Sequence, residues 1–267
     1  MRRLIEFPCA GDMLVGSLDE AEGATGLLIV SGGNEIRAGA HRGMASLAAR
    51  LASAGIPVFR FDRRGVGDSS GENRGFAESA PDIAAAAATF CAEARISRLV
   101  GFGNCDAATA LALFRQASGI DALILANPWI ADQTDDLPSA SAIKARYAQR
   151  LRDPREWLRA LRGGVNFASL TRGLRKIIDS KSEPTIELAT RLFASLAIDR
   201  SAITILLAAR DNTAIGFRAA WEAATRDASL DHVRIVNRDS ASHSFASGED
   251  KDWLFEQVTA ALARAAG

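Results

Sequence analysis

The chain has 267 residues, of which 48% are hydrophobic, enough to bury one large core or one core with a small insert. Its 32 basic and 32 acidic residues cancel to zero net charge, which gives no reason to expect nucleic-acid binding. The three cysteines and three histidines lack the spacing of a disulfide framework or a zinc site, so we expect no metal and no cofactor.

The first residues, Met1-Arg-Arg-Leu-Ile-Glu-Phe-Pro8, are basic at the start but have no apolar stretch behind them. This pattern predicts neither a signal peptide nor a transmembrane segment, and we expect a cytoplasmic protein with reduced thiols. Short alternating stretches at residues 5–7 and 13–15 predict an antiparallel hairpin at a sheet edge.

Strand-like and helix-like segments alternate between residues 26 and 127. The alternation predicts a mostly parallel sheet with helices on both faces, an α/β fold. The expected strands are 27–30, 57–61, 99–102 and 122–126, and the expected helices are 41–54, 81–94 and a third one that runs to about 118.

From residue 131 to 200 this rhythm stops. Helical patterns follow one another, with Pro138, Pro154 and Pro184 between them and no convincing strand. We therefore expect an α-helical cap at 131–200, inserted into a core made of residues 1–130 and 201–267.

Cys105 lies in the sequence Gly103-Asn-Cys-Asp-Ala107, between an expected strand and an alanine-rich helix. Gly103 and Ala107 are small enough for strand and helix to approach closely around a sharp turn, as in a nucleophile elbow. Cysteine stands here where serine is usual, and Ala107 replaces the last glycine. The turn directs the thiol towards a helix N-terminus, whose field favours a thiolate. The alternative is a small hydrophobe buried at the end of a strand.

Two later apolar runs, 203–207 and 233–236, are expected strands with polar residues after them. Asp211 follows the first, and His243 lies in the loop after the second. His243 would take the proton of the Cys105 thiol, and Asp211 would orient and stabilise the imidazolium. In the alternative interpretation, Asp211 caps a helix near residue 213 and His243 is a solvated loop residue.

An oxyanion hole is the next requirement of such a site. Its first donor is expected to be the backbone amide of Asp106, the residue after the nucleophile. The second should come from the loop Gly32-Gly-Asn34, which follows the first parallel strand and contains glycines that let the backbone approach a substrate. Gly33 and Asn34 are both candidates for it.

The expected cap is strongly basic in one window. Residues 142–176 hold ten lysines and arginines and two acids, a net charge of +8. A positive rim of this kind would attract an anionic substrate or an acyl carrier, with Arg146 and Arg150 as candidate substrate contacts. A solvated helix face is the alternative interpretation.

Together these motifs resemble the exosortase-associated α/β-hydrolases, which accompany bacterial exopolysaccharide and protein-sorting gene clusters. The resemblance covers nearly the whole chain. It implies an α/β-hydrolase fold and a hydrolase triad but no particular substrate, and Trp129 in one of its motifs is a candidate substrate contact. The matching stretches are Val30-Ser-Gly-Gly33, Ala40-His-Arg42, Phe61-Asp-Arg-Arg-Gly-Val-Gly-Asp-Ser69, Gly71-Glu72, Gly103-Asn-Cys-Asp-Ala-Ala108, Asn127-Pro-Trp129, Tyr147, Arg150-Leu151 and Trp157-Leu158.

We therefore expect a hydrolase that uses Cys105, His243 and Asp211 to cleave or transfer an acyl group from an ester or thioester. The substrate would be a small molecule or carrier-bound. A non-catalytic binding or scaffold protein that keeps the same fold is the competing hypothesis. The oligomeric state does not follow from the sequence.

Overall fold

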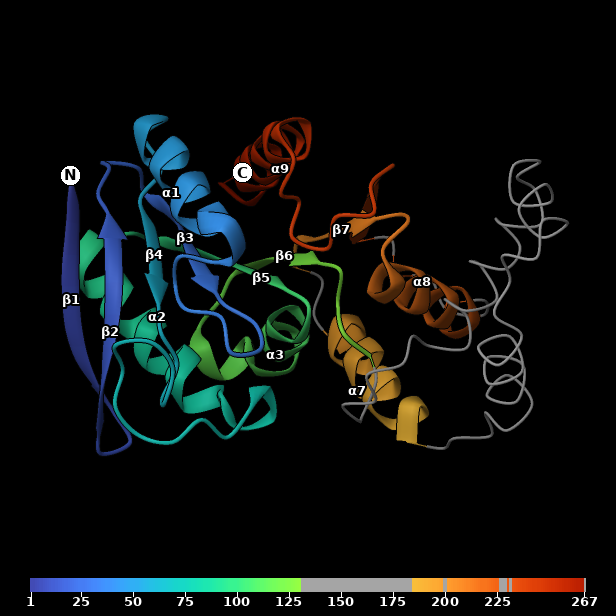
Figure 1. The fold of residues 1–267 in the computed structure, drawn as a ribbon, viewed down its shortest axis with the longest axis horizontal. Helices are drawn as coiled ribbons and strands as arrows, with labels where there is room; N and C mark the ends of the chain where they lie inside the picture. Colours follow the sequence, from blue (N-terminus) through green and yellow to red (C-terminus); the bar gives the residue numbers. More distant parts are fainter. Residues whose placement is uncertain (131–183, 199–200, 226–229, 231, 267) are drawn as a thin grey trace, which may run out of the picture.

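The computed structural model describes residues 1–130, 184–198, 201–225, 230 and 232–266. Their centre is an eight-stranded sheet in the order β1-β2-β4-β3-β5-β6-β7-β8 (Figure 1). The strands are β1 Arg2–Cys9, β2 Asp12–Asp19, β3 Thr25–Val30, β4 Val58–Phe61, β5 Arg98–Asn104, β6 Ala122–Ala126, β7 Ile203–Ala208 and β8 Val233–Arg238.

The N-terminal hairpin forms one edge of the sheet. β1 pairs antiparallel with β2, and β2 pairs antiparallel with β4. All pairs from β4 to β8 are parallel. The predicted hairpin and the predicted mostly parallel sheet are therefore confirmed. Strands β6 and β7 are buried along their whole length, which explains why they read as uninterrupted apolar runs.

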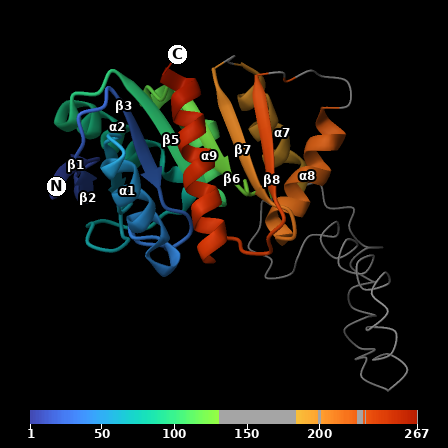
Figure 2. The ribbon, with the colours of Figure 1, turned by 90° about the horizontal axis from the view of Figure 1, so that it is seen from above.

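Helices cover both faces of the sheet, as predicted (Figures 1 and 2). Helices α1 and α9 contact each other and share one hydrophobic cluster, whereas the second cluster contains α2, α3, α7 and α8. The helices are α1 Gly43–Ser53, α2 Ala80–Ala94, α3 Asp106–Phe114, α7 Pro184–Ile198, α8 Asn212–Ala224 and α9 Gly248–Ala266. Within the described ranges, none of them is long and apolar enough to cross a membrane.

Helix α7 falls inside the range predicted for the cap, yet it packs with the core. It contacts α3 and α8, and the Leu192 side chain is fully buried in the same hydrophobic cluster as the strands. The Phe193 ring packs edge-on against Phe217 and Trp221 of α8. The rest of the expected cap lies outside the described residues, and so do Arg146 and Arg150.

The strand order reverses beside β3, because the chain passes from β3 to β4 on one side and to β5 on the other. Ligand sites in open α/β sheets lie at the carboxyl ends of strands at such a switch point. The glycine loop after β3 and the Cys105 turn after β5 both lie there.

Candidate active site

The turn at Cys105 has the backbone geometry of a nucleophile elbow. Cys105 has φ 61° and ψ −127°, a conformation that costs a non-glycine residue about 1–3 kcal/mol. Strand and helix approach so closely that a Cβ at Gly103 would lie 2.7 Å from the Ala107 carbonyl carbon. A glycine at position 103 is therefore required by the packing.

The neighbouring strand end holds the elbow in this conformation. The Cys105 N–H donates to the Ala126 carbonyl at 2.9 Å, and the Cys105 carbonyl accepts from the Trp129 N–H at 3.2 Å. The Thr109 hydroxyl donates in turn to the Trp129 carbonyl at 2.5 Å. These contacts tie the elbow to the end of β6 and offset the strain at Cys105.

Asp211 and His243 meet at the carboxyl ends of β7 and β8. His243 Nδ1 lies 3.0 Å from Asp211 Oδ2. The same oxygen accepts hydrogen bonds from the Thr213 and Ala214 amides at 3.1 Å, because Asp211 is also the N-cap of α8. The two interpretations of Asp211 are thus compatible: the cap fixes the carboxylate that contacts the histidine.

The environment of His243 favours its charged form. Burial disfavours the imidazolium, but hydrogen bonds to Asp211 and Cys105 and the attraction of both groups raise the pKa of His243 to about 10. Burial also acts against the Asp211 carboxylate, yet the bonds from His243 and the two helix amides lower its pKa. The arrangement therefore suits an imidazolium placed between the Cys105 sulfur and the Asp211 carboxylate.

Asn127 contacts the histidine loop, and no sequence pattern indicated this. Its buried side chain donates from Nδ2 to the His243 carbonyl at 2.9 Å and accepts from the Ala208 N–H at 2.9 Å. It also contacts Asn104 at 3.2 Å, next to the nucleophile. Asn127 has φ 41°, which asparagine tolerates better than most residues. One side chain thus joins the ends of β5, β6 and β7 to the loop that carries the base.

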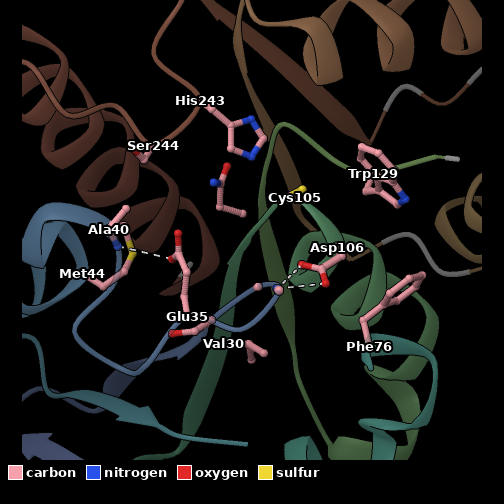
Figure 3. Close-up of a pocket in the computed structure, with 14 residues that line it drawn as sticks. Val30, Glu35, Ala40, Met44, Phe76, Cys105, Asp106, Trp129, His243 and Ser244 are labelled. Carbon is pink, nitrogen blue, oxygen red and sulfur yellow. Dashed lines mark hydrogen bonds between the residues drawn. The ribbon is translucent and has the colours of Figure 1, made fainter. Parts of the chain in front are cut away.

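A cavity of about 340 Å³ opens beside Cys105 and His243 (Figure 3). Apolar side chains form much of its wall, among them Met44, Phe76 and Trp129. Trp129, an expected substrate contact, therefore lies at the pocket. Its charged lining residues among those that the structure describes are Glu35, Asp106 and His243. The Glu35 carboxylate accepts a hydrogen bond from the Ala40 N–H at 3.3 Å.

The two candidates for the second oxyanion donor differ in position. Gly33 lines the cavity, whereas the Asn34 side chain accepts a hydrogen bond from Asn73 at 2.7 Å. The Gly33 N–H donates to both oxygens of the Asp106 carboxylate, at 2.8 and 2.9 Å (Figure 3). The sequence indicated Asp106 for its backbone amide, and this contact of its side chain was not anticipated.

The other two cysteines lie in different surroundings. Cys9 is buried on β1, and burial together with Asp82 raises the pKa of its thiol to about 11. Burial also raises the pKa of Cys91 on α2. In the part of the chain that the structure describes, no group of His, Cys, Asp and Glu residues is suited to hold a metal ion.

Comparisons with known proteins agree with this fold. The family model of the serine aminopeptidases, S33 (Hydrolase_4), matches residues 26–213. A search of curated protein sequences finds no match to this chain.

Solved structures with the same fold are many. An esterase from Pyrococcus furiosus, Pf2001, is 16% identical, with 100% of this chain and 91% of that chain covered and a TM-score of 0.67. DcsB, solved with a substrate analogue, is 15% identical over 100% of both chains, with a TM-score of 0.66. XC6422 from Xanthomonas campestris, described as a serine hydrolase without a lid, is 14% identical, with 98% of this chain and 94% of that chain covered and a TM-score of 0.60.

Proposed function

Since the chain belongs to the serine aminopeptidase S33 family of α/β-hydrolases, we propose that it is a hydrolase whose nucleophile is Cys105. The observation that carries this proposal is the pairing of His243 with Asp211 beside the thiol, with a pKa of His243 of about 10. A histidine that binds its proton this firmly can hold the proton of a thiol and leave a thiolate for attack.

The first half of the reaction transfers the acyl group to the protein. The Cys105 thiolate forms a bond to the carbonyl carbon, and the carbonyl π electrons move to the oxygen. That oxygen would accept hydrogen bonds from the Asp106 and Gly33 amides. When the carbonyl re-forms, the bond to the leaving group breaks, and His243 gives its proton to the departing alkoxide or thiolate.

The second half releases the acyl group from the thioester on Cys105. Neutral His243 takes a proton from water as its oxygen attacks the carbonyl carbon, and the Cys105 thiolate leaves. A sugar hydroxyl in place of water would make the protein an acyltransferase. Asp211 keeps the imidazole oriented in both halves and stabilises its charge.

The proposed substrate is an ester or thioester with a small or medium-sized acyl group. The cavity beside Cys105 offers about 340 Å³ and apolar walls, which suit a hydrocarbon chain. An alkoxide or thiolate is a better leaving group than an amide nitrogen, so a thiol nucleophile that forms a thioester favours these bonds. The link to exopolysaccharide or protein-sorting systems and the role of Arg146 and Arg150 rest on the sequence alone.

An acyl-donor panel tests this function. Wild type and Cys105→Ala are incubated with p-nitrophenyl esters and acyl thioesters of increasing chain length, and intact mass is measured during turnover. We expect an acyl adduct on Cys105 and turnover in the wild type only. Wild type that neither turns over any donor nor forms an adduct would instead favour a binding or scaffold protein.

A further inference from the structure

The oxyanion side of the pocket is closed by a carboxylate. Both Asp106 oxygens accept from the Gly33 N–H, which is the donor that a reacting carbonyl would need. We propose, on the premise of the function above, that the Asp106 side chain is a gate on the oxyanion hole and a specificity determinant. It holds the hole shut in the free protein and disfavours acyl groups that carry negative charge.

The backbone of the glycine loop makes room for this contact. A Cβ at Gly32 would overlap Asp106 Oδ1, so the carboxylate fits there only because residue 32 has no side chain. Gly33 itself has φ 52°, and the Arg63 guanidinium donates to its carbonyl. The same residue is therefore held from both sides, at its N–H by Asp106 and at its carbonyl by Arg63.

Arg63 also provides a counter-charge for the gate. Its side chain is buried, and burial lowers the pKa of the guanidinium while Asp106 and Asp82 oppose that shift. Arginine stays protonated under these conditions. The Asp106 carboxylate thus has a positive group in its surroundings as well as the N-terminus of α3, where it is the first helical residue.

Chemistry at Cys105 cannot proceed well with the gate closed. An oxyanion within hydrogen-bond distance of Gly33 N would lie beside the Asp106 carboxylate, and two negative charges at such a distance repel each other. The carboxylate must leave Gly33 before the hole accepts a developing charge. A second carboxylate, Glu35, lines the same cavity. The charge of an anionic substrate therefore belongs away from the acyl group.

Aldehydes test the gate without turnover. The Cys105 sulfur adds to the aldehyde carbon, the carbonyl π electrons move to the oxygen, and the thiol proton remains on His243 or passes to that oxygen. The adduct uses the oxyanion hole, but it has no leaving group. We choose butanal and succinic semialdehyde, which have the same four-carbon chain and differ by a carboxylate. Protection of Cys105 against iodoacetamide measures the affinity of each.

Three variants distinguish the effect of the Asp106 charge, of its contact with Gly33 and of a second charge in the cavity. Asp106→Asn keeps the shape of the side chain without its charge, and Asp106→Ala removes both. Glu35→Gln removes the charge of a cavity residue whose side chain contacts Ala40 and not Gly33. We expect butanal to bind at least about tenfold more tightly to both Asp106 variants than to wild type. Glu35→Gln should change its affinity less. The preference for butanal over succinic semialdehyde should shrink in Asp106→Asn.

The alkylation rate itself is the internal control. Iodoacetamide reacts at a saturated carbon and forms no oxyanion, so its rate should change much less than aldehyde affinity. Thermal unfolding shows whether the variants fold. Unchanged or weaker aldehyde binding in both Asp106 variants, or no protection in any variant, would overturn the gate. Tighter aldehyde binding without acylation by any ester would keep the gate and reject the hydrolase function.

Discussion

Two thiols of this protein lie beside a carboxylate and a basic side chain, with opposite consequences. At Cys9, the sulfur contacts Asp82 Oδ1 directly, at 3.6 Å, and Arg64 binds the same carboxylate oxygen at 2.6 Å. At Cys105, the histidine contacts both the thiol and Asp211. Both sites thus contain a thiol, a carboxylate and a basic side chain, but at Cys9 the carboxylate contacts the sulfur, whereas at Cys105 the basic side chain does.

The order decides which thiol has a proton acceptor beside it. The Cys9 thiol faces a negative charge in a buried site, which raises its pKa to about 11, and Arg64 stays protonated and cannot take a proton. The Cys105 thiol faces a base that is itself stabilised as a cation by a carboxylate. If Cys105 is the nucleophile, as proposed above, the decisive difference is that its base lies between the sulfur and the carboxylate, whereas at Cys9 the carboxylate contacts the sulfur directly.

Cys105→Ala should reduce ester turnover more than any other substitution. If Cys105 is the nucleophile, ester turnover should fall by about 10⁵ to 10⁶, the scale for loss of the nucleophile in a triad. In the wild type, iodoacetamide at pH 7 followed by peptide mapping should label Cys105 far faster than Cys9 and Cys91. Equal labelling of the three cysteines would remove the distinction between the two sites. Cys9→Ala is the matched control and should leave turnover unchanged.

His243→Ala should have the second-largest effect on the reactivity of Cys105. Without a base to accept its proton, the Cys105 thiol should be alkylated at least about tenfold more slowly at pH 7. The rate should recover as the pH rises towards 9, because solvent hydroxide can then take the proton. Stopped-time mass spectrometry over pH 6–10 measures it. If the variant keeps the wild-type rate at pH 7, another group ionises Cys105.

Asp211→Asn should reduce turnover by about 10²- to 10⁴-fold, because it removes the charge that stabilises the imidazolium and disturbs its tautomer. Asparagine is also a good N-cap, so the stability of α8 should hardly change, whereas Asp211→Ala should lower the free energy of unfolding by about 1 kcal/mol more. Comparing the two variants by turnover and by urea unfolding separates the two roles. Equal turnover in Asp211→Asn and wild type would leave the residue as a cap alone.

Asn127→Ala should lower kcat about 10- to 100-fold while KM changes little, since the side chain contacts the His243 loop and not the cavity. It should also cost about 1–3 kcal/mol of stability, because buried backbone groups lose their partners. Assays well below the melting temperature separate the two effects. A purely structural residue would leave the pH profile of alkylation unmoved, and this profile should shift if Asn127 positions the base.

The pH dependence of stability tests the raised pKa of His243 directly. The pKa of His243 is about 10 in the folded protein and about 6.5 when unfolded, so the folded state binds the proton more tightly. This contribution is complete below pH 6.5 and is lost as the pH rises towards 10. The difference in unfolding free energy between wild type and His243→Gln should therefore shrink over this range. Urea titrations at pH 6, 8 and 10 measure it, and a constant difference would contradict the raised pKa.

Much of the fold could be predicted because its signals are local. The strands β3 to β7 are short apolar runs, and the helices between them carry small and apolar residues at helical spacing. Helix α9 escaped prediction, since its apolar residues are spread among charged ones over 19 positions. Helix α7 was assigned to the cap because its sequence shows an amphipathic helix without showing which surface that helix covers.

The residue types of the candidate site could be inferred from their place after successive strands. Parallel strands bring their carboxyl ends to one edge of a sheet. The order of Cys105, Asp211 and His243 along the chain and the small residues around the elbow were therefore enough to predict that the three residues meet. Asn127 could be noticed only as part of a motif. Its role depends on contacts with residues 81 and 116 positions away.

The parallel sheet and the sharp turn at Cys105 could be predicted from the sequence by itself, because they depend on composition and on neighbours in the chain. For the same reason the sequence showed no residue spacing that would lead one to expect a metal. Only the tertiary structure decided which amide lines the pocket and what already occupies it. The bond between Asp106 and Gly33 joins residues 73 positions apart, and it exists because β3 and β5 are adjacent and Gly32 leaves room for a carboxylate. Hydrogen bonds across strand ends depend on distances of a few tenths of an ångström, which no local pattern records.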